Sequence, residues 1–105
     1  MCSSDLIPML VVTGSAIARP DSFEALLVAS IAHTRRSRGE PGCLSHAVHV
    51  DCENPLRLFF YEEWADREAL NVHFAQPGSL AFMAAVREFS ESTTGVKILP
   101  IAEPD

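Results

Sequence analysis

Side chains that can move a proton or bind an aromatic molecule are concentrated between Glu40 and Phe82. His73 can serve as a base or a hydrogen-bond donor, because histidine ordinarily titrates near neutral pH. Trp64, the sole tryptophan, can stack on an aromatic ring or donate its indole N–H. Glu62 shares a strand face with Trp64, and an inward carboxylate needs a partner, for which His73 is the obvious candidate. We therefore take His73, Trp64 and Glu62 as candidate catalytic residues.

Each of these three residues also has a purely structural interpretation. Trp64 can be a core aromatic that covers the end of a sheet. Glu62 and His73 can form a structural clasp, or His73 can bond to a backbone carbonyl. In the functional interpretation, the same carboxylate fixes the tautomer of His73. The sequence leaves both interpretations open.

A second group of residues is placed to line a cavity between helices and sheet. Several of them recur at helical spacing, which is equally typical of an ordinary core. The candidate substrate-binding residues are His46, Phe60, Phe74, Phe82 and Met83.

No metal site and no cofactor are expected. His46 and His49 lie three apart on a predicted strand, so they face opposite sides and cannot chelate one ion together. His33 lies late in a predicted helix and is expected to be partly exposed. Cys2, Cys43 and Cys52 match no zinc or redox spacing, and we interpret them as free thiols in a reducing compartment.

The elements that must position these residues follow from hydrophobic periodicity and from breaker residues. Asp66 is placed to cap a helix, and Pro77-Gly78 separates two helices. Pro100 indicates an edge strand or a strand end. The predicted strands are Met9–Ala18, Cys43–Val50, Arg57–Trp64 and Val96–Ile101, and the predicted helices are Ser22–Arg38, Arg67–Ala75 and Ser79–Phe89.

Two helices are expected to bury apolar faces against the sheet. Ser22 is expected to cap the first helix. Its predicted buried face consists of Phe23, Leu26, Leu27, Ile31 and Thr34. The predicted buried side of the last helix consists of Leu80, Phe82, Met83, Val86 and Phe89.

The element order predicts an α+β fold. With the two late helices counted as one layer, it is the split βαβ arrangement of ferredoxin-like folds, an antiparallel sheet with helices on one face. Residues 1–105 are expected to form one domain, with 1–7 as a loose leader. Because nothing in the chain remains to cover the other face of the sheet, we expect a homodimer that packs sheet on sheet.

Charge and composition argue against two classes of partner. The net charge is −6, and the densest basic cluster is Arg35, Arg36 and Arg38, where cations complement the negative end of a helix dipole. Such a chain offers little phosphate neutralisation, so no nucleic acid partner is expected. The N-terminal stretch has neither a positive region nor an apolar run long enough for a signal peptide or a membrane span. We expect a cytoplasmic protein.

Three short motifs in the correct order carry a family resemblance. They are Gly42-Cys43-Leu44, Glu62-Glu63-Trp64, and Ala69-Leu70 followed by His73. On these motifs, and over about forty residues, the chain resembles the antibiotic biosynthesis monooxygenase family, quinol-monooxygenase-like proteins of the dimeric α+β barrel type. It departs from the family pattern at His46, where tyrosine is common, and at Gly78, where a second histidine is frequent.

The resemblance implies a reaction as well as a fold. Several members of that family oxygenate phenolic, anthrone or quinol substrates with O₂ and use no metal, flavin or haem. An electron-rich aromatic anion can itself reduce O₂, so the protein need only bind it in a dry pocket and favour its deprotonated form. The resemblance therefore implies a quinol-like or polyketide-like aromatic substrate, with O₂ as co-substrate.

Three alternatives remain open. A haem-binding relative is one, although relatives of that kind carry an asparagine in the first strand, and 9–18 contains none. A small-metabolite isomerase is another, since His46 makes the pocket more polar and the fold hosts other activities. The third is a non-catalytic ligand-binding dimer.

Overall fold

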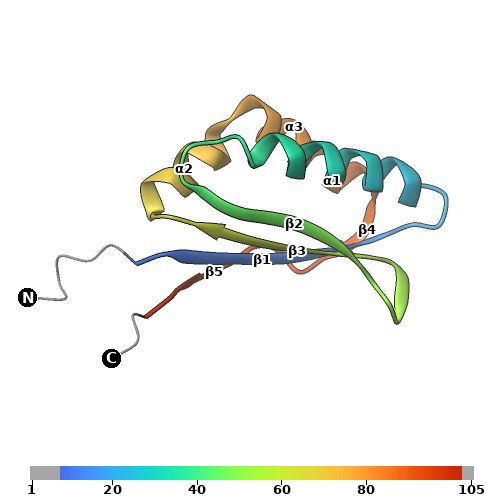
Figure 1. The fold of residues 1–105 in the computed structure, drawn as a ribbon. Coiled ribbons are helices and arrows are strands. Elements are labelled where there is room, and N and C mark those ends of the chain that lie inside the picture. Colours follow the sequence, from blue (N-terminus) through green and yellow to red (C-terminus); the bar gives the residue numbers. More distant parts are fainter. Residues whose placement is uncertain (1–7, 103–105) are drawn as a thin grey trace, which may run out of the picture.

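The computed structural model describes residues 8–102; the expected leader at 1–7 lies outside this range. Three helices cover one face of an antiparallel sheet, so the α+β ferredoxin-like prediction is confirmed (Figure 1). No helix among these residues has both the length and the apolar character needed to cross a membrane. The strands are β1 (Leu10–Ala18), β2 (Cys43–Asp51), β3 (Asn54–Trp64), β4 (Ser90–Thr93) and β5 (Lys97–Pro100), and the helices are α1 (Phe23–Ser37), α2 (Arg67–Ala75) and α3 (Pro77–Phe89).

The sheet has the order β2-β3-β1-β4, and β5 also pairs with β1. All four pairings are antiparallel. Val12, Glu62 and His46 lie opposite one another across β1, β3 and β2. Because alternate strand residues face the same side, Phe60, Glu62 and Trp64 all point toward the helices, as the sequence predicted.

The C-terminal part of the sheet differs from the prediction. A single strand, Val96–Ile101, was expected, but two short strands pair with β1 in succession. The missed strand β4 has the sequence Ser-Glu-Ser-Thr and shows no apolar alternation. Backbone pairing holds it, together with the Ser15 N–H, which donates to Thr94 Oγ1 at 3.0 Å. Periodicity cannot detect a strand that is defined by its backbone partners alone.

The N-terminal caps predicted for two of the three helices have different outcomes. Asp66 Oδ1 accepts a hydrogen bond from the Ala69 N–H at 2.8 Å, so the predicted cap of α2 is confirmed. Ser22 precedes α1, but its hydroxyl donates to the Phe89 carbonyl at 2.8 Å instead of accepting from the helix. The predicted cap is therefore wrong, and Ser22 ties the start of α1 to the end of α3.

The buried sides of α1 and α3 are more polar than predicted. Of the five residues expected to be buried on α1, only Leu26 and Thr34 are; on α3, Leu80 and Met83 are 59% and 42% exposed. Part of each helix, at His33 on α1 and at Phe82 and Met83 on α3, lines a cavity instead of closing on a solid core. The buried residues of α1 are Leu26, Ser30, His33, Thr34 and Ser37.

Two apolar clusters flank the buried Glu62 side chain on β3. One is built around Ala16, Leu26 and Leu58, and the other contains Trp64 and Leu70, both of which have no exposed surface. Glu62 lies between them on the same strand face. The fold therefore holds a buried carboxylate between two regions of tightly packed side chains.

Candidate functional site

His73 lies on α2 with only 2% of its surface exposed, and its ring is held by a carboxylate. Its Nδ1 lies 2.7 Å from Glu40 Oε1, in the turn that follows α1. Because a carboxylate oxygen accepts, Nδ1 carries the proton in this bond, and in the neutral ring Nε2 keeps a free lone pair. Glu62, the predicted partner, is farther away, with Oε1 4.0 Å from His73 Nε2. Glu40, not Glu62, fixes the tautomer.

Glu62 is the centre of a buried polar group. The Trp64 Nε1–H donates to Oε1 at 2.9 Å, and His46 Nε2 lies 3.3 Å from Oε2. Burial by itself raises the pKa of this carboxyl, but the contacts with His46 and Trp64 outweigh burial and hold the pKa below its usual range. Glu62 is therefore ionised at neutral pH. The indole N–H of Trp64 serves the structure by donating a hydrogen bond to this carboxylate.

His33 is only 5% exposed, so the prediction of a partly exposed side chain is wrong. Its ring stacks on Phe82, with centroids 4.2 Å apart and planes 7° from parallel. Its Nδ1 lies 2.6 Å from the Arg36 guanidinium. Burial first, then the neighbouring His46, His73 and Arg36, lowers the pKa of His33 to about 3. The ring is therefore neutral at physiological pH.

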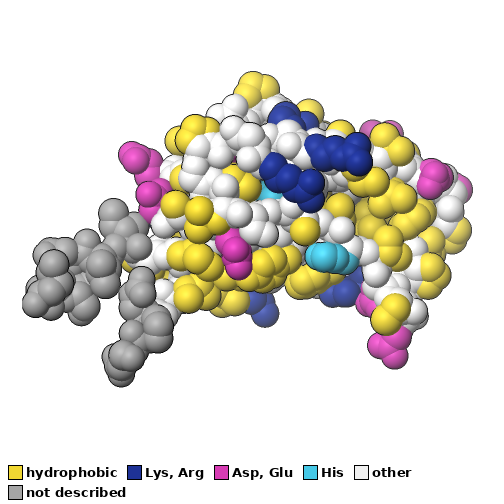
Figure 2. Space-filling view, in the orientation of Figure 1, with side chains coloured by type: hydrophobic (Ala, Val, Ile, Leu, Met, Phe, Trp, Pro, Cys, Tyr) yellow, Lys and Arg dark blue, Asp and Glu magenta, His cyan; other side chains and the backbone are white. Residues whose placement is uncertain are grey.

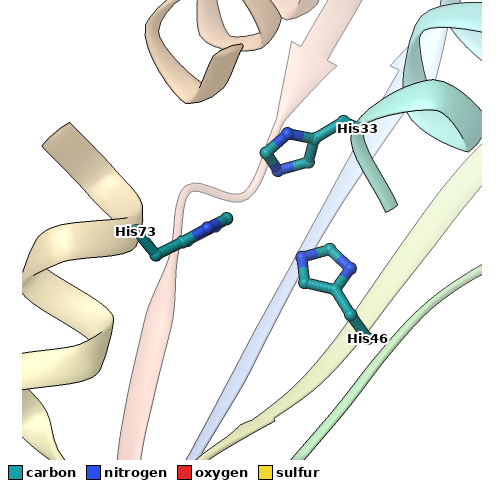
Figure 3. A group of neighbouring side chains, drawn as sticks. All are labelled: His33, His46 and His73. Carbon is teal, nitrogen blue, oxygen red and sulfur yellow. The ribbon is translucent and has the colours of Figure 1, made fainter. Parts of the chain in front are cut away.

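Three histidines meet in this site, and Figure 3 shows their rings turned toward one another from α1, β2 and α2. The ring centroids are 5.3 Å apart for His33–His46 and for His33–His73, and 5.7 Å apart for His46–His73. One nitrogen from each ring lies within 4.8 Å of the others. His46 is fully buried; its Nδ1 has no hydrogen-bond partner within the described chain, and its Nε2 faces Glu62 Oε2 at 3.3 Å.

The spacing of the three rings suits a metal ion, but the proton positions do not. With metal–nitrogen bonds of about 2 Å, three imidazoles around a tetrahedral ion have centroids about 5 Å apart. A ligand nitrogen must also offer a lone pair. The guanidinium of Arg36 can only donate, so it occupies the lone pair of His33 Nδ1 and leaves the proton on Nε2. In this arrangement His33 presents an N–H to the cluster, and only part of the donor set fits a metal.

A cavity of about 120 Å³ lies beside the histidines, between the sheet, α1, α2 and α3. Of the predicted site residues, His73, Glu62, Phe60, Phe74, Phe82 and Met83 line it. His46 and Trp64 do not line it and lie behind Glu62 and His73. The other lining residues are Val12, Thr13, Gly14, Ser15, Ala16, His33, Ser79, Val86, Thr93, Gly95 and Val96.

Three ionisable residues of the site were not predicted: His33, Arg36 and Glu40. The helical periodicity used for α1 places His33 three residues before Arg36, on neighbouring turns, and that spacing was the available signal. Glu40 lies in the turn before Gly42, and no periodicity applies to a turn. Only the packing of α1 beside α2 and α3 brings these side chains to His73.

The arrangement supplies both halves of a proton-transfer site. His73 Nε2 is an acceptor at the cavity wall, and Glu40 stabilises the imidazolium that forms when this nitrogen takes a proton. The walls around it are largely aromatic and aliphatic. An apolar wall with an oriented base, next to the Glu62 carboxylate, suits a small aromatic molecule that carries an acidic hydroxyl group.

Sequence and structure comparisons find relatives across most of the chain. The chain is 32% identical over 94 residues to an uncharacterized protein of Synechocystis sp.; the match covers 90% of this chain and 64% of the relative, so the chain spans less than two thirds of that protein. The structure of Rv0793 from Mycobacterium tuberculosis has a TM-score of 0.83 at 28% identity and covers 92% of this chain and 99% of its own.

The structure of SO0527 from Shewanella oneidensis has a TM-score of 0.82 at 25% identity, with 88% of this chain and 89% of that chain covered. The family model described as antibiotic biosynthesis monooxygenase matches residues 9–85. These residues contain every side chain that we have placed in the polar group, including His33, Glu62 and His73. By this match, the chain belongs to the antibiotic biosynthesis monooxygenase family.

Proposed function

We propose that the chain is a monooxygenase that oxidises a small quinol-like aromatic with O₂ and without a cofactor. The observation that carries the proposal is the free Nε2 lone pair of His73, held at the wall of an apolar cavity by the Glu40 carboxylate. A hydroxyl group bound there can lose its proton to His73. The resulting aromatic anion is electron-rich and can pass an electron to O₂ directly.

The proposed reaction balances without another reductant. His73 takes the hydroxyl proton, and the anion transfers one electron to O₂ to give a semiquinone radical and superoxide. These two radicals combine into a carbon–oxygen bond, and the peroxide anion so formed takes the proton back from His73. The resulting hydroperoxide then breaks its O–O bond with loss of water. A quinol thereby becomes a hydroxyquinone: one oxygen atom of O₂ enters the product, and the other leaves as water. The largely apolar wall protects the radical pair from side reactions.

The size of the cavity narrows the substrate class. Benzene fits an apolar protein cavity of about 150 Å³, so the 120 Å³ found here suits a single ring. A three-ring polyketide would extend beyond this volume. We therefore favour one-ring quinols and catechols over polyketide-like substrates.

The test of this function is oxygen uptake with a graded panel of substrates. We expect uptake above the uncatalysed background with one-ring hydroquinones, less with naphthoquinols and least with anthrones, because the ring system outgrows the cavity. Mass spectrometry after ¹⁸O₂ labelling should find one labelled oxygen in the product. Uptake at background rates across the whole panel would argue against an oxygenase. Turnover of a substrate in the absence of O₂ would favour an isomerase.

We also propose that the chain forms a homodimer through the face of the sheet that the helices leave uncovered. Members of the family typically form dimers. On this face Phe59 and Tyr61 are half-buried and Leu99 is 42% exposed. Figure 2 shows hydrophobic side chains gathered along the lower side of the molecule, where Figure 1 places the sheet.

Light scattering after size-exclusion chromatography tests the dimer. We expect twice the chain mass for the wild type and a monomer for Phe59→Glu, because the substitution places a charge in an apolar interface. Val28→Glu is the matched control, since Val28 is 65% exposed on the helical side and should leave the dimer intact. A wild-type monomer at micromolar concentration would contradict the proposal.

A further inference from the structure

We propose that Arg36 fixes His33 as a hydrogen-bond donor to the cavity, so that His33 stabilises the oxyanion formed when His73 takes a proton from the substrate. This inference deepens the proposed function and depends on it only for the link to turnover. It rests on two histidines that line one cavity and that carry their protons on different ring nitrogens.

The proton positions follow from the partners of the two Nδ1 atoms. Arg36 can only donate, so His33 Nδ1, 2.6 Å from Nη2, is an acceptor, and in the neutral ring the proton resides on Nε2. Glu40 can only accept when ionised, so His73 Nδ1 is a donor and its Nε2 is bare. The two side chains therefore present complementary groups to the cavity, one N–H and one lone pair.

Gly78 is what allows Arg36 to occupy this position. A Cβ atom built at Gly78, in the first turn of α3, would overlap the Arg36 guanidinium. Arg36 is exposed toward solvent, so without this packing its long side chain would have many other conformations. The glycine therefore restrains the guanidinium beside His33 and strengthens its preference for one tautomer.

The spacing of the histidines suits a single oxygen atom between them. Two nitrogens that each bond to one oxygen at about 2.8 Å lie about 4.5 Å apart when the angle at the oxygen is tetrahedral. The nitrogens that the three rings turn to one another lie within 4.8 Å. A substrate hydroxyl can thus donate to His73 Nε2 and accept from His33 Nε2–H. When its proton moves to His73, the His33 N–H remains aimed at the negative oxygen.

The first experiment reads the tautomer of His33 from the ¹⁵N chemical shifts of its ring nitrogens. We expect the wild type to show an unprotonated Nδ1 and a protonated Nε2. In Arg36→Met and in Gly78→Ala, both shifts should move toward the average of two tautomers. Arg35→Met is the matched control, since Arg35 is exposed on the same helix and makes no hydrogen bond or ion pair with any part of the described chain. His33→Phe, which keeps the stacking on Phe82, identifies the signals.

The second experiment measures binding of a nitrophenol under nitrogen, where no turnover can occur. The visible absorbance of the anion gives the affinity of the anion relative to that of the neutral phenol. We expect His33→Phe to lower this ratio by about tenfold or more, the loss expected for a hydrogen bond to a charged oxygen. Gly78→Ala should lower it less, because the ring can still switch tautomer and the positive charge remains nearby.

The outcomes separate this inference from the proposed function. Either of two results would overturn the role of Arg36. One is a wild-type His33 that carries its proton on Nδ1. The other is a set of ¹⁵N chemical shifts that is the same in Arg36→Met and Gly78→Ala as in the wild type. An unchanged ratio in His33→Phe would overturn the oxyanion contact. Stoichiometric Zn²⁺ uptake that His33→Phe abolishes would overturn both, because a metal needs the lone pair on Nε2. If both experiments succeed and no quinol consumes O₂, the oxygenase proposal fails and this one stands.

Discussion

Replacing His73 with phenylalanine should lower the rate of oxygen uptake about 10²- to 10⁴-fold, the usual contribution of a positioned general base. The phenylalanine ring fills the same volume and can keep the contact with Trp64, whose ring centroid lies 4.5 Å from that of His73. The proton acceptor is lost, so the bound hydroxyl stays protonated and cannot reduce O₂. The measurement is kcat at saturating quinol, followed with an oxygen electrode.

Two variants make the result for His73 specific. His49→Phe is the matched control, since His49 is exposed on the opposite face of β2 and should leave the rate unchanged. Glu40→Gln keeps an oxygen that can accept from His73 Nδ1 but removes the charge that stabilises the imidazolium. Its rate should fall between those of the wild type and His73→Phe. A rate in His73→Phe within tenfold of the wild type would exclude His73 as the base.

Replacing Glu62 with glutamine should destabilise the fold in a pH-dependent manner. The pKa of Glu62 in the folded chain lies below its ordinary value of 4.5. A lowered pKa means that the stabilisation is fully present above pH 4.5 and is lost as the pH falls through the folded-state pKa. At neutral pH we expect a loss of about 1–3 kcal/mol, because the charge that accepts from Trp64 and contacts His46 is removed.

Urea unfolding at several pH values measures this effect. The difference in unfolding free energy between wild type and Glu62→Gln should be largest at neutral pH and should shrink toward zero in acid, where the wild-type carboxyl is protonated. Glu63→Gln is the control, because Glu63 lies on the opposite face of β3 and, among residues 8–102, its oxygen accepts only from the Tyr61 hydroxyl. A difference that stays constant from pH 7 to pH 3 would contradict an ionised Glu62 in the folded chain.

The sequence was most informative where a local pattern specifies a backbone conformation. The aromatic strand that ends at Trp64, the Asp66 cap and the helix of His73 are each specified by neighbours within a few positions. The alternation of β3 also placed Glu62 and Trp64 on the helix side and Glu63 on the other. It failed at β4, which has no pattern of its own and depends on β1.

The same limit explains the errors in the buried faces. Periodicity predicted mainly apolar buried faces on α1 and α3, but the structure buries Ser30, His33 and Ser37 on α1 and exposes Leu80 on α3. A cavity between the helices and the sheet replaces part of the expected core. Hydrophobic patterns describe how one element meets an average interior. They do not report that a particular interior is hollow.

The sequence by itself determined the fold class and identified four members of the polar group, His46, Glu62, Trp64 and His73, because each lies on an element with a clear period. Only the tertiary structure decided which groups surround His73. Glu40 and His33 come from a turn and from another helix, 33 and 40 positions earlier in the chain, and they reach it because α1 packs beside α2 and α3. Proton positions depend on contacts of this kind, within hydrogen-bond distance, which no local pattern specifies.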